Sequence, residues 1–158
     1  MQFERNELTL WFLIPLYCLR MPAHRTTIVP RFGELDPYNH VNHAAYVAYF
    51  EAARCVALDD IEMSLADLSE RGLQIVVTQL DVRFREAATA RDTLTVETQI
   101  TELKRVSSTW KQRIIRDIDG KDLVEAALTL GVCDLRGKPT RPPGDLNTSL
   151  SRLMENDD

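Results

Sequence analysis

The second half of the chain alternates apolar and polar residues over long stretches, which is the pattern of half-buried β-strands. The alternation covers residues 80–85, 93–101, 107–117 and 123–134. Asp119-Gly120 lies between the last two stretches and is a typical sequence for a tight hairpin turn. This half of the chain therefore predicts consecutive antiparallel strands joined by short turns.

The first half of the chain has a different periodicity. Thr26–Phe32 is rich in β-branched residues and predicts one strand that ends before Gly33. From His43 to about Leu58, alanine recurs at every fourth position and aromatic residues occupy the other faces, which predicts a long helix enclosed by the sheet. Ser64 then precedes a shorter helix that ends at Gly72.

The order of these elements predicts an α+β domain. One strand, one long helix and one short helix precede a run of strands, so we expect a curved antiparallel sheet of about five strands wrapped around one long central helix. The opposite face of the sheet carries threonine and charged side chains. We expect that face to contact solvent or another subunit.

Length and composition divide the chain into three parts. At 158 residues, the chain is long enough for one domain with its own core. We expect residues 1–22 to be an apolar N-terminal extension, residues 23–146 the domain, and residues 147–158 a C-terminal tail. Within that tail, Thr148–Met154 has the pattern of a short helix.

The N-terminal extension contains an apolar segment, Leu8–Leu19, which is too short to cross a membrane as a helix and is interrupted by Pro15. Acidic residues before it and the lack of a small-residue cleavage site argue against a signal peptide. The favoured interpretation is an appended segment, with the domain beginning near Met21. The alternative is a segment that packs on the domain, on a partner or on a membrane surface.

Charge and cysteine content exclude several classes of function. A formal net charge of -5 argues against a nucleic-acid-binding protein, which would normally be basic. Cys18, Cys55 and Cys133 are far apart and have no spacing typical of a disulfide framework or a metal site. We therefore expect a reducing, cytoplasmic location and no metal ion.

The residues with the clearest chemical potential stand between the first strand and the long helix. Pro37 disfavours helix at Asp36, Asn39 tolerates a left-handed conformation, and Asn42 is a suitable N-cap for a helix that begins at His43. A helix start offers unpaired N–H groups and the positive end of the helix dipole, which stabilise a polarised carbonyl or an oxyanion. The pattern predicts a site in which a carboxylate attacks a carbonyl or activates water.

Residues 32–46, Phe-Gly-Glu-Leu-Asp-Pro-Tyr-Asn-His-Val-Asn-His-Ala-Ala-Tyr, also carry a family resemblance. The stretch resembles the strand end, turn and helix start of the hotdog-fold acyl-CoA thioesterases, in the group related to 4-hydroxybenzoyl-CoA thioesterase. Residues 82–98 give a weaker match, and the resemblance runs from about Ile28 to Arg136. The chain departs from the family pattern at Asn39, where many relatives have glycine.

The resemblance implies hydrolysis of an acyl-CoA thioester to the free acid and coenzyme A, without a metal or a bound organic cofactor. The family's catalytic carboxylate, a nucleophile or general base, corresponds to Asp36, and the N–H that polarises the thioester carbonyl corresponds to that of His43. The resemblance also implies that Lys104, Arg105 and Ser107 bind the phosphates of coenzyme A, which is part of the substrate. A homodimer or homotetramer is expected.

Two other functions are compatible with the sequence. One is a non-catalytic subunit that binds acyl thioesters or supports an assembly. The other is a hotdog dehydratase or hydratase, which would need an Asp/His pair acting as acid and base on the acyl chain. The sequence has no second motif for that pair.

Overall fold

The computed structural model describes residues 23–154. The predicted extension of residues 1–22, including Leu8–Leu19 and Met21, lies outside the described residues, as do residues 155–158. The described chain forms a five-stranded antiparallel sheet with the strand order β1-β3-β4-β5-β2. The strands are β1 (His24–Ile28), β2 (Leu73–Phe84), β3 (Leu94–Leu103), β4 (Ser107–Arg116) and β5 (Lys121–Asp134).

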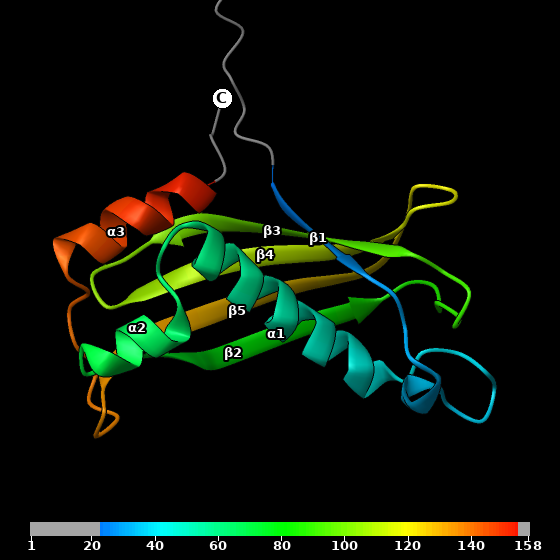
Figure 1. Cartoon of the computed structure of the whole chain (residues 1–158), viewed down its shortest axis with the longest axis horizontal. Coiled ribbons are helices and arrows are strands. Elements are labelled where there is room, and N and C mark those ends of the chain that lie inside the picture. Colours follow the sequence, from blue (N-terminus) through cyan, green and yellow to red (C-terminus); the bar gives the residue numbers. More distant parts are fainter. Residues whose placement is uncertain (1–22, 155–158) are drawn as a thin grey trace, which may run out of the picture.

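The long helix α1 (His43–Asp60) lies across one face of this sheet, as Figure 1 shows. It packs against β1 and β3, while the short helix α2 (Leu65–Glu70) packs against β2. Ser64 caps α2 by accepting the N–H of Asp67 at 3.0 Å. Among residues 23–154, no helix is long and apolar enough to cross a membrane. The predicted α+β fold, a curved antiparallel sheet around one long helix, is confirmed.

The first strand is displaced toward the N-terminus relative to the prediction. β1 pairs with β3 only as far as Ile28, whereas the sequence predicted a strand up to Phe32. Pro30 has no N–H to donate to a sheet ladder, so the chain leaves the sheet before it. Phe32 instead begins the 3-10 turn η1 (Phe32–Glu34), which leads toward the candidate site.

The second strand begins earlier than its alternation indicated. β2 starts at Leu73, although the clear alternation starts only at Leu80. A β-bulge between Val77 and Gln79 shifts the pairing with β5 and interrupts the period of two. β2 is also an edge strand, so only one of its sides is paired with a neighbouring strand.

The C-terminal helix begins before the predicted range of Thr148–Met154. Helix α3 (Gly144–Leu150) starts directly after Pro143 and continues into the 3-10 turn η2 (Ser151–Leu153). The side chains that these two elements bury in the core are Leu146, Leu150 and Leu153. The packed part of the chain thus continues beyond residue 146.

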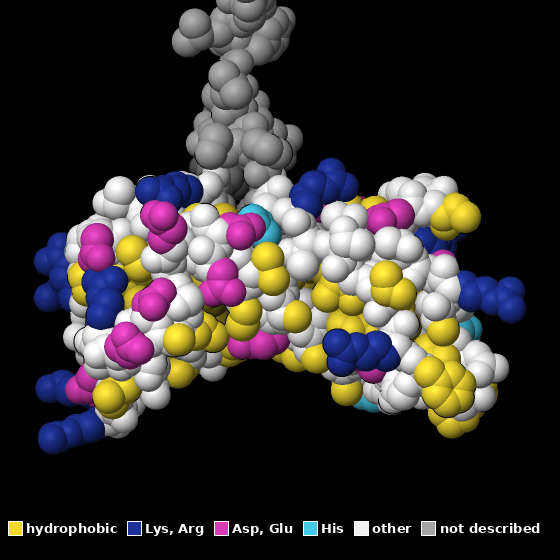
Figure 2. Space-filling model, in the orientation of Figure 1, with side chains coloured by type: hydrophobic (Ala, Val, Ile, Leu, Met, Phe, Trp, Pro, Cys, Tyr) yellow, Lys and Arg dark blue, Asp and Glu magenta, His cyan; other side chains and the backbone are white. Residues whose placement is uncertain are grey.

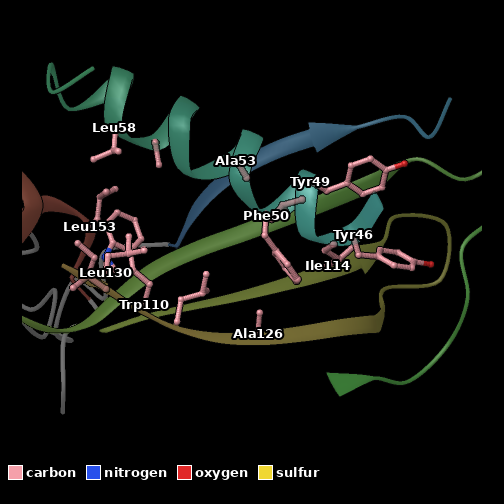
Figure 3. Packing of buried hydrophobic residues seen from close by; sticks show 14 of the residues in the cluster. Tyr46, Tyr49, Phe50, Ala53, Leu58, Trp110, Ile114, Ala126, Leu130 and Leu153 are labelled. Carbon is pink, nitrogen blue, oxygen red and sulfur yellow. The ribbon is translucent and has the colours of Figure 1, made fainter. Parts of the chain in front are cut away.

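The hydrophobic core lies between α1 and the sheet, as Figure 3 shows. Phe50 and Ala53 of α1 are fully buried, and Trp110 and Ile114 of β4 face them from the sheet. The small side chain of Ala53 lets the helix approach the strands closely. Alternate residues of β5 are buried, as the sequence predicted, and they are Val124, Ala126, Leu128, Leu130 and Val132.

A buried polar network fixes α1 on the sheet. The Arg54 guanidinium donates to Gln112 Oε1 at 2.8 Å, and Gln112 Nε2 donates to the carbonyl oxygen of Phe50 at 3.0 Å and to Thr98 Oγ1 at 2.9 Å. Arg54 also forms an ion pair with Glu51. Because unpaired polar groups in a core are costly, the network stabilises the packing of the middle of α1 on the sheet.

Candidate active site

Asp36 lies in a turn held by its own carboxylate. Asp36 Oδ1 accepts the N–H groups of Tyr38 at 2.9 Å and of His40 at 3.0 Å. The Asp36 N–H donates to the carbonyl oxygen of His40 at 2.7 Å, and Asn39 has the predicted left-handed conformation with φ of 60°. Within residues 23–154, Asp36 Oδ2 accepts no hydrogen bond. The turn therefore fixes the carboxylate and leaves one oxygen available.

The start of α1 provides a backbone donor next to this turn. Asn42 is the N-cap, as predicted, and its side chain accepts the N–H of Ala44 at 2.9 Å. The N–H of Ala45 donates to the Asn42 carbonyl oxygen at 2.9 Å. In the part of the chain that the structure describes, the N–H of His43 has no acceptor. The first turn of α1 thus presents one free amide at the positive end of the helix dipole.

The turn folds back on itself, which brings Asp36 and the helix start to the same end of the sheet (Figure 1). Leu35 and Val41 form an isolated antiparallel bridge, and the Asn42 N–H donates to the Glu34 carbonyl oxygen at 2.8 Å. A carboxylate oxygen and an unpaired N–H are the groups needed to attack a carbonyl and to stabilise the oxyanion that forms. The fold thus places the turn of Asp36 and the start of α1 at the same end of the sheet.

Glu34 links the turn to the helix. Glu34 Oε2 accepts the Tyr49 hydroxyl at 2.6 Å and the Arg31 N–H at 2.7 Å. The hydrogen bond from Tyr49 lowers the pKa of the Glu34 carboxyl below its ordinary value. Burial raises the pKa of the Tyr49 hydroxyl, and its bond to the Glu34 carboxylate raises it further. At neutral pH the pair is therefore an ionised carboxylate and a protonated phenol.

A second link runs through Ala88, which is fully buried in the loop after β2. The Val41 N–H donates to the Ala88 carbonyl oxygen at 2.8 Å, and the Ala88 N–H donates to the Tyr46 hydroxyl at 2.8 Å. The same loop is held on β5 because the Arg85 N–H donates to the carbonyl oxygen of Leu123 at 2.8 Å. Sequence reasoning missed Glu34, Tyr46, Tyr49 and Ala88, because their contacts join residues far apart in the chain.

The predicted phosphate-binding residues lie at the other end of the sheet. Ile28 pairs with Leu94, so the turn of Asp36 follows the end of β1 that lies beside the start of β3. Lys104, Arg105 and Ser107 lie in and directly after the turn between β3 and β4, beyond the far end of β3. At about 3.3 Å per residue, β3 separates the two groups by about 30 Å.

The three predicted phosphate-binding residues are accessible to solvent, and two of them also contact neighbouring residues. Lys104 and Arg105 are exposed, and Ser107 is half-buried. Lys104 Nζ forms an ion pair with Glu102 at 3.0 Å, and the Lys104 N–H donates to the Ser107 carbonyl oxygen at 2.7 Å. No group of three or more His, Cys, Asp or Glu side chains within the described range is arranged to hold a metal ion.

Comparison with known proteins identifies the family. Residues 30–150 match the family model of the thioesterase-like superfamily. The chain belongs to this superfamily. It is 28% identical over 132 residues to the long-chain acyl-CoA thioesterase FadM of Escherichia coli strain K12, covering 83% of this chain and 99% of FadM. FadM and the other curated relatives to which the chain is similar are named as thioesterases or thioester hydrolases, and the chain is a thioester hydrolase as well.

Two further comparisons agree with the sequence and the fold. The acyl-CoA thioester hydrolase YbgC of Escherichia coli O6:H1 is 31% identical over 114 residues, which cover 71% of this chain and 84% of YbgC. A DHNA-CoA thioesterase of Staphylococcus aureus superposes with a TM-score of 0.76 over 82% of this chain and 89% of that protein, at 24% identity. The second likeness concerns the fold alone. The curved sheet around one helix is the predicted hotdog fold.

Proposed function

We propose that this protein hydrolyses acyl-CoA thioesters to the free acid and coenzyme A. The observation that carries the proposal is the combination of a free Asp36 Oδ2 and a free His43 N–H at one end of the sheet, within the described part of the chain. The thioesterase family, and relatives whose names specify acyl-CoA substrates, support it. A non-catalytic binding subunit would not need the free carboxylate oxygen.

In the proposed reaction, the thioester carbonyl oxygen binds the N–H of His43. Asp36 Oδ2 either attacks the carbonyl carbon or removes a proton from a water that attacks it. The C–S bond then breaks and coenzyme A leaves as a thiol once protonated. Direct attack gives an acyl–Asp36 anhydride, which water hydrolyses. The step uses the carboxylate, the backbone amide and water, with no bound cofactor.

The two roles of Asp36 differ in one intermediate. Direct attack transfers the acyl group to the enzyme, whereas general-base catalysis does not. Rapid quenching during the first turnover, followed by mass spectrometry, tests for an added acyl mass on the peptide that contains Asp36. An acylated peptide together with a burst of thiol release identifies the nucleophilic role of Asp36.

Coenzyme A binding is proposed to involve two subunits. Lys104, Arg105 and Ser107 are too far from Asp36 in one chain to bind the phosphates of the same coenzyme A molecule whose thioester reaches Asp36, so we assign them to the site of a partner subunit. Exposed apolar side chains on the edge strand β2 and on α1 support association of two or four copies. They are Val47, Val56, Val76, Val77, Leu80 and Phe84.

Figure 2 shows hydrophobic side chains exposed among charged ones on the face drawn in Figure 1. Sedimentation or light scattering of the full chain measures the number of subunits. A monomer that retains full activity would contradict a site shared between subunits. We propose a cytoplasmic location, which the odd number and wide spacing of the cysteines in the sequence support.

The decisive experiment is a thiol-release assay with short, long and aromatic acyl-CoAs. We expect turnover with at least one of them and a loss of at least about a hundredfold in Asp36→Ala. Undiminished turnover in Asp36→Ala would overturn the mechanism. Tight binding of acyl-CoA without thiol release would instead identify a binding subunit, and formation or loss of a double bond in the acyl chain would identify a dehydratase or hydratase.

A further inference from the structure

Two tyrosines of α1 reach the two segments that flank the candidate site. Tyr49 donates to Glu34, which precedes Asp36 in the turn, and Tyr46 accepts from Ala88, whose carbonyl oxygen binds Val41 at the end of the turn. In Figure 3 both rings extend from α1 with their hydroxyl oxygens pointing away from Trp110 and Leu130. The rings pack edge to face, with centroids 6.0 Å apart.

These bonds connect the turn to the rest of the molecule. Among the described residues, hydrogen bonds join residues 34–41 to parts of the chain outside residues 31–45 at two points only, Glu34 with Tyr49 and Val41 with Ala88. The first is made by α1 directly, and the second reaches α1 through the Tyr46 hydroxyl. Because the N–H of His43 belongs to the same helix, both bonds tie the turn to the element that supplies the oxyanion donor.

We propose that Tyr49, Glu34 and Tyr46 are positioning residues that fix the Asp36 carboxylate relative to the N–H of His43. This inference rests on the proposed hydrolysis at that site. None of the three needs to touch the reacting atoms. A carboxylate and a donor must act on the two ends of one carbonyl bond, and a misplacement of about 1 Å costs about a hundredfold in rate.

The ring and the hydroxyl of each tyrosine have separable roles. Tyr46 and Tyr49 are 3% and 5% exposed, so their rings contribute to the core whatever the hydroxyl contacts. Replacement by phenylalanine keeps the ring and removes one hydrogen bond. A loss of activity in such a variant would therefore report on the position of the turn rather than on the packing of the helix.

The test compares kcat and KM of Tyr49→Phe, Tyr46→Phe and the double variant, measured well below their melting temperatures. We expect each single variant to lower kcat by about tenfold or more with KM changed less than about twofold. The double variant should lose less than the product of the two single losses, because either loss already releases the turn. A purely structural role would lower Tm and leave kcat unchanged.

Two substitutions of Glu34 separate the loss of its hydrogen bonds from the loss of its charge. Glu34→Gln keeps a side-chain oxygen that accepts the bonds of Tyr49 and Arg31, so kcat should stay within about threefold of wild type. Glu34→Ala removes the acceptor of both bonds and should lower kcat at least as much as Tyr49→Phe. Equal losses of kcat in Glu34→Gln and Glu34→Ala, with Tyr49→Phe unaffected, would overturn the proposal.

Thr98→Val is the matched control. It also removes one buried hydroxyl, which accepts from Gln112 in the network beneath α1 and lies outside the candidate site. We expect a lower Tm and an unchanged kcat. If Tyr49→Phe and Tyr46→Phe behave like Thr98→Val while Asp36→Ala is inactive, the positioning role is wrong and the proposed function stands. An active Asp36→Ala would overturn both.

Discussion

Residues 36–40 and 134–138 form the same turn at opposite ends of the sheet. Asp134 Oδ1 accepts the N–H groups of Arg136 and Lys138, both at 2.9 Å, as Asp36 Oδ1 accepts those of Tyr38 and His40. Each turn has a left-handed residue three positions after the aspartate, and each is closed by an isolated antiparallel bridge. Locally, the two aspartates cannot be distinguished.

The two turns differ in the segment to which each one leads. The turn of Asp36 leads into the 18-residue helix α1, whose first amide is free within the described part of the chain. The turn of Asp134 leads through Pro139 into a loop before α3. A carboxylate that accepts backbone N–H groups in its own turn therefore stabilises that turn, and this role alone does not indicate catalysis. In the proposed function, the helix start next to Asp36 is the feature that distinguishes the two turns.

The largest expected difference between the two turns is in kcat when each aspartate is replaced by asparagine. Asp36→Asn and Asp134→Asn each keep a side-chain oxygen that accepts the same two N–H groups, so both turns should persist. We expect Asp36→Asn to lose at least about a hundredfold in kcat, because an amide neither attacks nor removes a proton, while Asp134→Asn keeps wild-type kcat. Equal activities in the thiol-release assay would show that Asp36, too, is only structural.

The next effect concerns substrate binding at the end of the sheet that holds Asp134. Removing both charges in Lys104→Ala/Arg105→Ala should raise KM for acyl-CoA by about three- to tenfold and leave kcat unchanged, since exposed ion pairs contribute modestly. The difference in KM between the double variant and wild type should shrink at high salt, because salt screens charge interactions. Arg141→Ala/Arg152→Ala changes the net charge equally and is the control, so an equal rise in KM there would indicate long-range electrostatics rather than contact.

A smaller effect is expected from the helix cap beside Asp36. Asn42→Ala and Ser64→Ala each remove an N-cap side chain and should each lower the free energy of unfolding by about 1 kcal/mol. Only Asn42→Ala, which loosens the first turn of α1, should also lower kcat. Denaturant unfolding and the thiol-release assay on both variants measure the two quantities, and a similar loss of kcat in Ser64→Ala would contradict the role of the α1 start.

The smallest effect is a pH dependence of stability at Glu34. The folded state lowers the pKa of this carboxyl, so its ionised form stabilises the fold above the ordinary value of 4.5, and this contribution is lost as pH falls through the lower folded value. The difference in Tm between wild type and Glu34→Gln should therefore be constant at neutral pH and shrink in acid.

The control for this titration is the same comparison in a Tyr49→Phe background. Because the Tyr49 hydroxyl is the largest cause of the lowered pKa, the acid-dependent part of the Tm difference should diminish there. A Tm difference that grew in acid would contradict the direction of the shift.

Much of the fold and part of the site could be predicted because their causes are local. Asp36-Pro37 and Asn39 specify a turn through their own backbone preferences, and Asn42 specifies a helix start. The alternation of apolar residues along β5 likewise results from one strand having one buried face.

The features that could not be predicted depend on contacts between distant parts of the chain. Tyr46 and Tyr49 have the periodicity of core aromatics, and the sequence does not reveal that their hydroxyls reach residues 88 and 34. The bulge in β2 likewise depends on the register with β5. The turn of Asp134 has a local cause in the sequence. Gly137 follows Asp134 by three residues, as Asn39 follows Asp36, and both residues have a left-handed conformation.

The bond from Arg85 to Leu123 has a consequence for the order of folding. β2 pairs with β5, which is made after β3 and β4, and the loop that carries Ala88 is anchored on Leu123. Closing such long loops is entropically slow compared with forming α1 or a hairpin. The segment near residue 36 emerges early during synthesis, yet it acquires its second anchor only after the last strand has joined the sheet. We therefore expect the turn of Asp36 to reach its final position late in folding, and a chain truncated before β5 to lack this anchor.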